Sequence, residues 1–238
     1  GKADIAVHSL KDMTAKCPDG LTIGAVTARE DPRDAFVSNK YKSLEELPPH
    51  AKVGTSSLRR QAQLLHWRND LSIGTLRGNV QTRLRHLDEG DFDAIILAAA
   101  GLKRLGLGDR ITSFISTEDS IPAAGQGVMA VEARSDDADT LSMISFLHDS
   151  HVASCIASER AFLARVGGDC KVPAGIYAVP DGTEGIHVEA FIASPNGKQL
   201  FRGENSGKKG DAEKLGDALA GRLLDEGGRE ILEKMSKI

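Results

Sequence analysis

The chain has 238 residues, of which 40% are hydrophobic and 27% charged, and its net charge is −4. This composition is ordinary for a globular protein, and the length exceeds what one small core holds, so two or three domains are expected. Aromatic residues make up only 4% of the chain, which argues against a platform for stacking nucleic-acid bases. We therefore expect no nucleic-acid partner.

The cellular setting is indicated by apolar runs and by the cysteines. No apolar run approaches the roughly 18 residues that span a bilayer, and no signal peptide is evident. The cysteines, Cys17, Cys155 and Cys170, have neither disulfide nor zinc-ligand spacing, so no metal site is predicted. These features favour a cytoplasmic protein without membrane contact. The chain starts at Gly1-Lys2-Ala3 and runs directly into a strand-like segment, so we expect an N-terminal segment to be missing.

The charge is unevenly distributed along the chain. The segment from Lys52 to Arg110 contains ten basic and six acidic residues, although the chain as a whole is acidic. A local basic patch on an acidic protein favours an anionic small ligand over bulk nucleic-acid binding. The alternative interpretation is a solvated helix face.

The first half of the chain alternates between strand-like and helix-like segments. Apolar runs predict strands at residues 4–7, 21–26, 52–54, 71–76 and 92–98. Helices are expected to open at Ser56, to span 80–87 and to run through Leu102 and Leu105. This alternation indicates a parallel α/β domain, in which ligands bind at the carboxyl ends of the strands.

The second half changes character after residue 148. A strand at 128–131 and a helix at 141–147 come first, and a helix is predicted at 152–166. Strands are then expected at 175–179, 187–193 and 199–203, and a helix at 211–224 that stops at Gly227-Gly228. The last third therefore predicts a small α+β domain with an antiparallel sheet.

An anion site is predicted where the strand at 52–54 meets its helix. The segment Gly54-Thr55-Ser56-Ser57-Leu58-Arg59-Arg60 places small residues at a helix N-terminus, where backbone N–H groups attract anions. Arginine suits carboxylate or phosphate groups because its donors bind them in pairs. The Gly-Lys-Ser/Thr ending of a P-loop is absent. A serine N-cap with exposed arginines is the alternative.

Two further strand-to-helix loops repeat this pattern. Leu76-Arg77-Gly78-Asn79 leads into a helix that contains Arg83, and the third strand is followed by a segment with Gly101 and Arg104. Three successive loops that deliver arginine to one sheet edge are more specific than any one of them. A ligand with many carboxylates would match this arrangement.

Two residues outside these loops could carry chemistry. Asp12 follows the first strand within Ser9-Leu10-Lys11-Asp12, a position suited to proton transfer or to stabilising a cation; a helix cap or surface ion pair is the alternative. Cys170 lies in a loop after two glycines and beside Lys171. A neighbouring lysine lowers a thiol pKa and favours a nucleophile, although Asp169 opposes this effect, and an unreactive cysteine is the alternative.

Several motifs, taken together, resemble the hydroxymethylbilane synthase (porphobilinogen deaminase) family. The matching stretches occur in order along nearly the whole chain: Ala3–Asp12, Arg29–Val37, Val53–Arg60, Leu76–Val80 with Thr82–Leu84, Asp93–Leu97 with Ala100–Gly106, Pro122–Gly127, and the segment around Cys170. The Arg-x-Ser motif and the Gly-Gly-Lys-Gly loop that open the family's sequences are absent. The thiol follows Gly-Gly-Asp, whereas in many relatives it follows Gly-Gly directly.

The resemblance implies a three-domain architecture. Two α/β domains would resemble the lobes of type II periplasmic binding proteins, and a small C-terminal α+β domain would contain a three-stranded antiparallel sheet. Domain 1 would be discontinuous, with residues 1–27 and 126–147; domain 2 would span 28–125 and domain 3 148–238. A monomer is expected.

The resemblance also implies a reaction and its site. Four porphobilinogen molecules would be condensed head to tail into hydroxymethylbilane, with release of ammonia, on a dipyrromethane cofactor bound covalently to Cys170. Asp12 would be the catalytic residue. Cofactor contacts would come from Ser9, Lys11, Asp12, Thr55, Ser57, Arg59, Arg60, Arg77, Arg83 and Gly101, and substrate contacts from Arg59, Arg77, Arg83 and Arg104. The alternative is a non-enzymatic polycarboxylate-binding protein of the two-lobed periplasmic type, which gives Cys170 no role.

Overall fold

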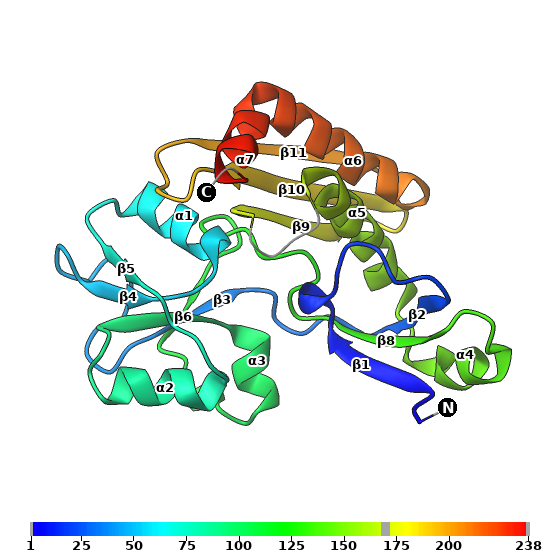
Figure 1. Cartoon of the computed structure of the whole chain (residues 1–238), viewed down its shortest axis with the longest axis horizontal. Helices are drawn as coiled ribbons and strands as arrows, with labels where there is room; N and C mark the ends of the chain where they lie inside the picture. The colour runs from blue at the N-terminus through cyan, green and yellow to red at the C-terminus, as the bar shows by residue number, and fades with distance from the viewer. Residues whose placement is uncertain (1, 168–171, 237–238) are drawn as a thin grey trace.

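A computed structural model describes residues 2–167 and 172–236. The described chain forms three lobes, each built on one sheet (Figure 1). Lobe 1 contains strands β1, β2 and β8, lobe 2 contains β3 to β7, and lobe 3 contains β9 to β11. The predicted fold class, α/β lobes followed by a domain with a three-stranded antiparallel sheet, is confirmed.

Lobe 1 is assembled from two distant parts of the chain. Its strands are β1 (Ile5–Ser9), β2 (Leu21–Val26) and β8 (Met129–Arg134), and β8 lies between the other two, antiparallel to both. Helix α4 (Ala138–Ile144) begins at Asp137, whose carboxylate accepts from the Thr140 amide. Leu141 and Ile144 of this helix pack against the sheet. The 3-10 helix Ser145–Leu147 follows α4 in the chain.

Lobe 2 has a mixed sheet with the order β5-β4-β6-β3-β7. The strands are β3 (Asp34–Val37), β4 (Lys52–Gly54), β5 (Ser72–Gly74), β6 (Ala94–Ala98) and β7 (Ser113–Ile115). β4 pairs in parallel with β5 and β6, but β3 runs antiparallel to β6 and β7. The predicted strands at 52–54, 71–76 and 92–98 thus form the parallel part of the sheet, and β3 and β7 add an antiparallel part that was not predicted. β3 is buried along its whole length and shows no alternation, and β7 has only three residues, so neither gave a strand pattern.

Three helices flank this sheet, as the apolar periodicity predicts. They are α1 (Leu58–Trp67), α2 (Val80–Asp88) and α3 (Ala99–Arg104), and the 3-10 helix Gly108–Arg110 follows. Ser57 caps α1 and Asn79 caps α2, each through a side-chain oxygen that accepts a backbone N–H. One core lies on each sheet face, so both faces are covered.

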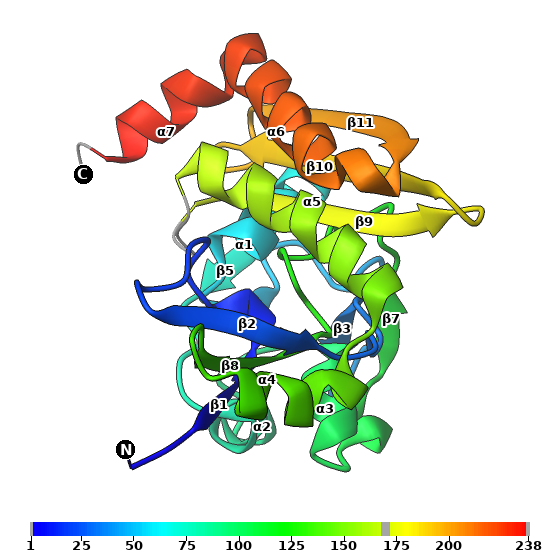
Figure 2. The same cartoon turned by 90° about the vertical axis from the view of Figure 1, so that its right-hand side faces the viewer.

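Lobe 3 is a three-stranded sheet covered on one face by helices. β9 (Ala174–Asp181), β10 (Gly185–Ala193) and β11 (Leu200–Lys208) pair antiparallel, and α5 (Ser150–Val166) and α6 (Ala212–Leu223) pack together against them (Figure 2). The 3-10 helix Lys209–Asp211 precedes α6. The helical backbone breaks at Gly227, whose φ is 136°, as the predicted stop at Gly227-Gly228 requires. A separate short helix, α7 (Arg229–Met235), begins directly after this break.

Two chain segments cross between lobes 1 and 2 and hydrogen-bond to each other. The Glu30 amide donates to the Gly127 carbonyl over 3.0 Å, and Gln126 Nε2 donates to the Pro32 carbonyl over 2.6 Å. The buried Glu159 on α5 connects lobe 3 to both of these segments. Its carboxylate accepts from Arg29 at 2.7 Å and from the Gly125 amide at 2.6 Å. One buried carboxylate therefore joins lobe 3 to both segments that connect lobes 1 and 2.

Within residues 2–167 and 172–236, no helix is both long and apolar enough to cross a bilayer.

The close approach of the two segments that connect lobes 1 and 2 predicts that Gly127 tolerates no side chain. Its φ is +88°, and a Cβ would lie 2.3 Å from the Glu30 carbonyl oxygen. Gly90 has a similar φ of +84° with nothing within 4 Å, so Gly90→Ala isolates the backbone cost. We expect Gly90→Ala to lower the free energy of unfolding by about 1 kcal/mol and Gly127→Ala by about 3 kcal/mol. Urea denaturation measures both; equal losses would contradict the close-contact argument.

Candidate active site

A cavity of about 590 Å³ opens where the three lobes meet. Lobe 1 contributes the turn after β1, lobe 2 the start of α1 and part of α2, and lobe 3 the end of α5 and the start of β9. The volume lies in the range of small-molecule sites. The lining residues are Lys11, Asp12, Met13, Thr14, Ser56, Ser57, Arg59, Arg60, Arg83, Ala123, Ala124, Gln126, Leu163, Val172 and Ala174.

Asp34, the first residue of β3, holds three of the lining residues in place: Arg59, Arg60 and Gln126. These three residues are called the cavity floor below. The Asp34 carboxylate is fully buried and accepts hydrogen bonds from two arginines that follow each other on α1. Arg59 Nη2 lies 2.8 Å from Oδ2, and Arg60 Nη2 lies 2.8 Å from Oδ1. Gln126 and Ser120 donate to the same carboxylate over 2.9 and 3.0 Å. Lobe 2 and the crossing segment are therefore locked to one anion.

The electrostatics of this cluster leave positive charge at the cavity. Burial would raise the pKa of Asp34, but the guanidiniums of Arg59 and Arg60 outweigh it and hold the pKa well below its ordinary range. One negative charge then faces two positive ones, so one positive charge remains uncompensated. Among the described residues, none accepts a hydrogen bond from the buried Arg59 Nε. Burying this donor unpaired costs free energy, which an anion bound there would recover. The cluster is suited to attracting an anion.

Lys11 and Asp12 are held at the cavity by a short turn. The 3-10 helix Leu10–Asp12 is anchored by Leu10, which is 2% exposed and packs on Val26 and Val128. Burial, followed by the nearby Arg60, lowers the pKa of Lys11 from 10.5 to about 8. The side chain of Asp12 is exposed on the cavity wall. A cation and a carboxylate thus lie side by side at this wall.

Arg83 is the cationic group that α2 contributes. Its Nε donates to the Gly78 carbonyl over 2.8 Å, which fixes the side chain against the preceding loop. Burial lowers its pKa, and the repulsion of Arg60 acts in the same direction. A half-buried guanidinium near another cation gains more from an incoming carboxylate than a free surface arginine does.

Several predicted contact residues do not line this cavity. Thr55 is buried and its hydroxyl accepts from the Ser57 amide at 3.2 Å. Arg77 is exposed, and Gly101 lies within α3. Arg104 donates to the Gly127 carbonyl over 2.7 Å, which ties α3 to the crossing. Ser9 is the N-cap residue of the 3-10 helix before Asp12 and forms no capping hydrogen bond.

The thiols differ in how much the structure says of them. Burial raises the pKa of Cys155 to about 11, which makes it a poor nucleophile at neutral pH. Cys17 is half-buried, and its Sγ lies 4.0 Å from Arg160 Nη2. Cys170 lies outside the described residues, but Val172, two positions further along the chain, lines the cavity.

Sequence reasoning missed the residues that support the site. Asp34, Gln126 and Glu159 are buried polar groups, and each acts through hydrogen bonds to partners distant in sequence. The available signal was the charged pair Arg33-Asp34 directly before the apolar run Ala-Phe-Val, because a carboxylate at the start of a buried strand needs a partner.

These features define a class of protein in which two α/β lobes are connected by two chain segments. A third domain packs against these segments, and a cationic cavity lies where the three parts meet. Two family descriptions match the chain. "Porphobilinogen deaminase, dipyromethane cofactor binding domain" matches residues 1–142, and "Porphobilinogen deaminase, C-terminal domain" matches residues 153–225. The chain belongs to the porphobilinogen deaminase family.

Solved structures of periplasmic binding proteins are more distantly similar. A protein from Salmonella typhimurium described by its high arginine specificity is 17% identical, with a TM-score of 0.38 over 61% of this chain and 65% of its own. A substrate-binding protein of an ABC transporter from Coxiella burnetii is 19% identical, with a TM-score of 0.39 over 59% of this chain and 67% of its own. The chain thus covers less than two thirds of the Salmonella protein. At these TM-scores the similarity adds no functional argument.

Asp34→Asn tests the support of the cavity floor. The change keeps the size of the side chain but leaves two buried guanidiniums without their counter-charge, which costs about 3–5 kcal/mol of unfolding free energy. Asp88→Asn is the matched control, because Asp88 pairs with Arg110 at the surface over 2.6 Å and should cost under about 1 kcal/mol. Urea denaturation measures both, and similar small losses would show that Asp34 is not required for the packing.

Proposed function

We propose that the protein is a hydroxymethylbilane synthase, a transferase that joins four porphobilinogen molecules into hydroxymethylbilane and releases ammonia. The observation that carries this proposal is the cationic cavity with Asp12 at its wall and Val172, close in sequence to Cys170, in its lining. The match to a dipyrromethane cofactor binding domain supports the same reading. Each pyrrole unit of the substrate has an acetate and a propionate side chain, so the ligand is a polycarboxylate.

The residues present fit a dipyrromethane bound to Cys170. Among the described lining residues, Lys11, Arg59, Arg60 and Arg83 are cationic, whereas Asp12 is the one acid. Two linked pyrroles have four carboxylates, and this excess of positive charge complements them. When bound, the group supplies the pyrrole end to which new units are added. Lys11, Ser57 and Arg83 are the residues that would hold it, and Arg59 and Arg60 would add positive potential.

Two kinds of interaction would bind the ligand: the positive potential of buried arginines, and direct hydrogen bonds from residues with free donors. Most donors of Arg59 and Arg60 already bind Asp34 and the Ile121 and Ile96 carbonyls. These two arginines therefore act mainly through their positive potential. Arg83 and Lys11 have donors available to carboxylates, and Ser56 and Ser57 stand at the N-terminus of α1, where the helix dipole favours anions.

Asp12 is the proposed catalytic residue. Its carboxylate would accept hydrogen bonds from pyrrole N–H groups and so orient the ring in the cavity. Loss of ammonia from porphobilinogen generates positive charge on the substrate, and a fixed carboxylate beside it lowers the energy of that charge. Lys11, next to it, would bind a carboxylate side arm of the substrate.

The remaining predicted contacts lie outside the cavity lining. Arg77 is exposed on the loop after β5, a position suited to meeting a longer pyrrole chain. Arg104, Ser9, Thr55 and Gly101 do not line the cavity and stay predictions. We also propose that the protein acts as a monomer in the cytoplasm, where a reduced thiol at Cys170 is maintained.

Intact mass and turnover together test the function. The protein isolated from cells should have the mass of the polypeptide plus two linked pyrrole units, and should convert porphobilinogen. Cys170→Ser should lose both the added mass and turnover, whereas Asp12→Asn should keep the fold and lose at least about 100-fold in turnover. Cys17→Ser is the matched control and should change neither. A bare polypeptide mass with no turnover would favour the polycarboxylate-binding alternative.

The pKa of Lys11 predicts a pH dependence of ligand binding. Its lowered pKa of about 8 means that Lys11 is charged below pH 8 and neutral above it. Affinity for a polycarboxylate should therefore fall as the pH rises from 7 to 9. Lys11→Arg stays charged across this range and should flatten the profile. Calorimetric titration with a dipyrrole tetracarboxylate, in protein that lacks the Cys170 thiol, measures both; an unchanged slope in Lys11→Arg would contradict this role.

A further inference from the structure

The face of the lobe 3 sheet that turns away from α5 and α6 has two distinct halves. Near lobe 2 it is buried, because Phe191 on β10 packs against Ala62 and Ile121. Further along the same strand, Glu189 and His187 follow on the same face, since alternate residues of a strand share a face. This second half lies beyond the contact with lobe 2 and is partly open to solvent.

Strand register brings three metal-binding side chains together on this half. Glu189 lies directly opposite Glu204 of β11, and His187 lies directly opposite Ser206. His187, Glu189 and Glu204 each offer one nitrogen or oxygen atom, and these three atoms all lie within 4.8 Å of one another. His187 Nε2 is 3.8 Å from Glu189 Oε1 and 3.9 Å from Glu204 Oε2.

The orientation of the His187 ring is set from its other nitrogen. Nδ1 lies 2.9 Å from Ser206 Oγ, and in the tautomer in which Nδ1–H donates to this hydroxyl, Nε2 is unprotonated. A second contact that fixes the tautomer in this way is typical of histidines that bind metals. Nε2 itself is 3.8 Å or more from both carboxylates, which is too far for a hydrogen bond, so neither carboxylate occupies its lone pair.

Electrostatics give this space a preference for a cation. Two carboxylates directly opposite each other on paired strands repel and destabilise the pair. Arg202 relieves part of this repulsion, because its Nη2 lies 2.9 Å from Glu189 Oε2 and its other end donates to the Glu118 carbonyl. Glu189 Oε1 remains directed at His187, and the side chain of Glu204 is 71% exposed and forms no other ion pair in the described residues.

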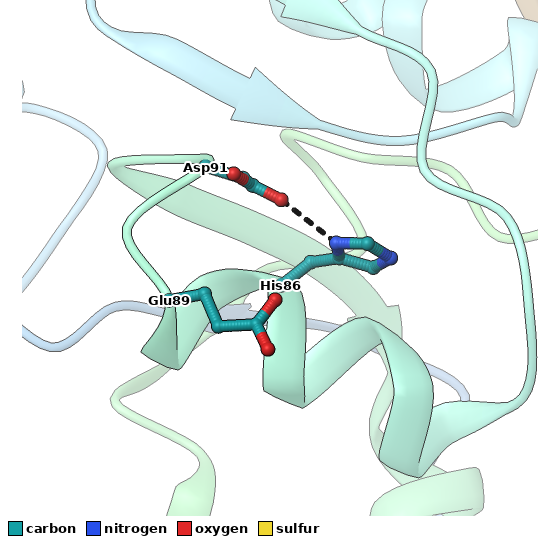
Figure 3. Close-up of side chains that lie close together, drawn as sticks. All are labelled: His86, Glu89 and Asp91. Carbon is teal, nitrogen blue, oxygen red and sulfur yellow. Dashed lines mark hydrogen bonds and ion pairs between the residues drawn. The ribbon is translucent and has the colours of Figure 1, made fainter.

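The second cluster of similar composition differs in this respect. His86, Glu89 and Asp91 lie at the end of α2 and in the turn that follows (Figure 3). There the Asp91 carboxylate binds His86 Nδ1 directly over 2.8 Å, and Glu89 pairs with Arg85 over 3.7 Å. Hydrogen bonding and a helix ion pair account for these groups, so this cluster serves as a control.

We propose that His187, Glu189 and Glu204 form a binding site for a divalent transition metal of the Zn²⁺ type on the outer face of the lobe 3 sheet. Zinc takes imidazole nitrogen and carboxylate oxygen at about 2.0–2.2 Å, which places tetrahedral ligand atoms about 3.4 Å apart. The two distances from His187 Nε2, 3.8 and 3.9 Å, must shorten by about half an ångström to reach that value. All three ligand atoms lie within 4.8 Å of one another, so rotation of the exposed Glu204 side chain can bring them to zinc-binding distance. Water completes the fourth position.

Calorimetric titration with Zn²⁺ in the presence of a non-metal-binding buffer tests the site. The wild-type chain should bind one equivalent more than His187→Ala, with a dissociation constant on the order of 10 µM. Ser206→Ala should weaken this equivalent by about tenfold through loss of the fixed ring. His86→Ala is the matched control and should bind as the wild type does. Counting equivalents by difference separates the site from metal bound at thiols.

Two results would overturn the proposal. One is equal zinc stoichiometry and affinity in the wild type and His187→Ala, and the other is loss of the equivalent in His86→Ala. Circular dichroism and melting temperature in the presence of a chelator show whether each variant is folded. In a folded wild type, Zn²⁺ should also raise the melting temperature by a few degrees, and His187→Ala should abolish that shift.

Discussion

The structure depends on one buried carboxylate that is shared by two adjacent arginines. Asp34 lies at the start of β3, and Arg59 and Arg60 begin α1, so a single anion fixes the helix to the sheet. Such a group is costly to bury, and it remains charged because both guanidiniums bind it. A carboxylate with one cation would give a neutral pair. Here the second arginine leaves positive charge that is directed at the cavity.

This arrangement separates two tasks that surface arginines combine. A flexible arginine that binds a ligand carboxylate loses side-chain entropy on every binding event. Arg59 and Arg60 are held in place by the fold before any ligand arrives, so their potential is preorganised. Arg83 and Lys11, which have fewer internal partners, are left to make direct contacts. A site of this kind can hold ligands of increasing length without rebuilding its floor.

Local patterns were enough to predict most of the fold, but not its long-range pairings. The helices at α1 and α2 follow from apolar periodicity, and the structure shows that Ser57 and Asn79 cap them. The antiparallel sheet of lobe 3 follows from turns between alternating strands. β3 has no alternation because both of its faces are buried, so its antiparallel direction could not be read. At the site, the structure brings Lys11, Asp12, Ser57 and Arg83 to one cavity, and their roles there stay predictions.

The roles of buried polar residues depend on neighbours that sequence spacing does not reveal. Arg59 and Arg60 were identified as cations, but their partner Asp34 is 25 and 26 positions away. Glu159 meets Arg29 across 130 positions. No periodicity links residues at such distances. The cluster of His187, Glu189 and Glu204 escaped notice for the same reason, because strand register rather than a short motif brings its members together.

The strand order of lobe 1 has a consequence for how the chain acquires its structure during synthesis. β1 and β2 do not pair with each other, and the strand that joins them, β8, begins only at Met129. As the chain leaves the ribosome, all strands of lobe 2 emerge before the centre of lobe 1 exists. The sheet of lobe 1 can therefore form only after every strand of lobe 2 has been synthesised. A translational pause before β8 would prolong exposure of both unpaired strands, and chaperone capture would be strongest at that stage.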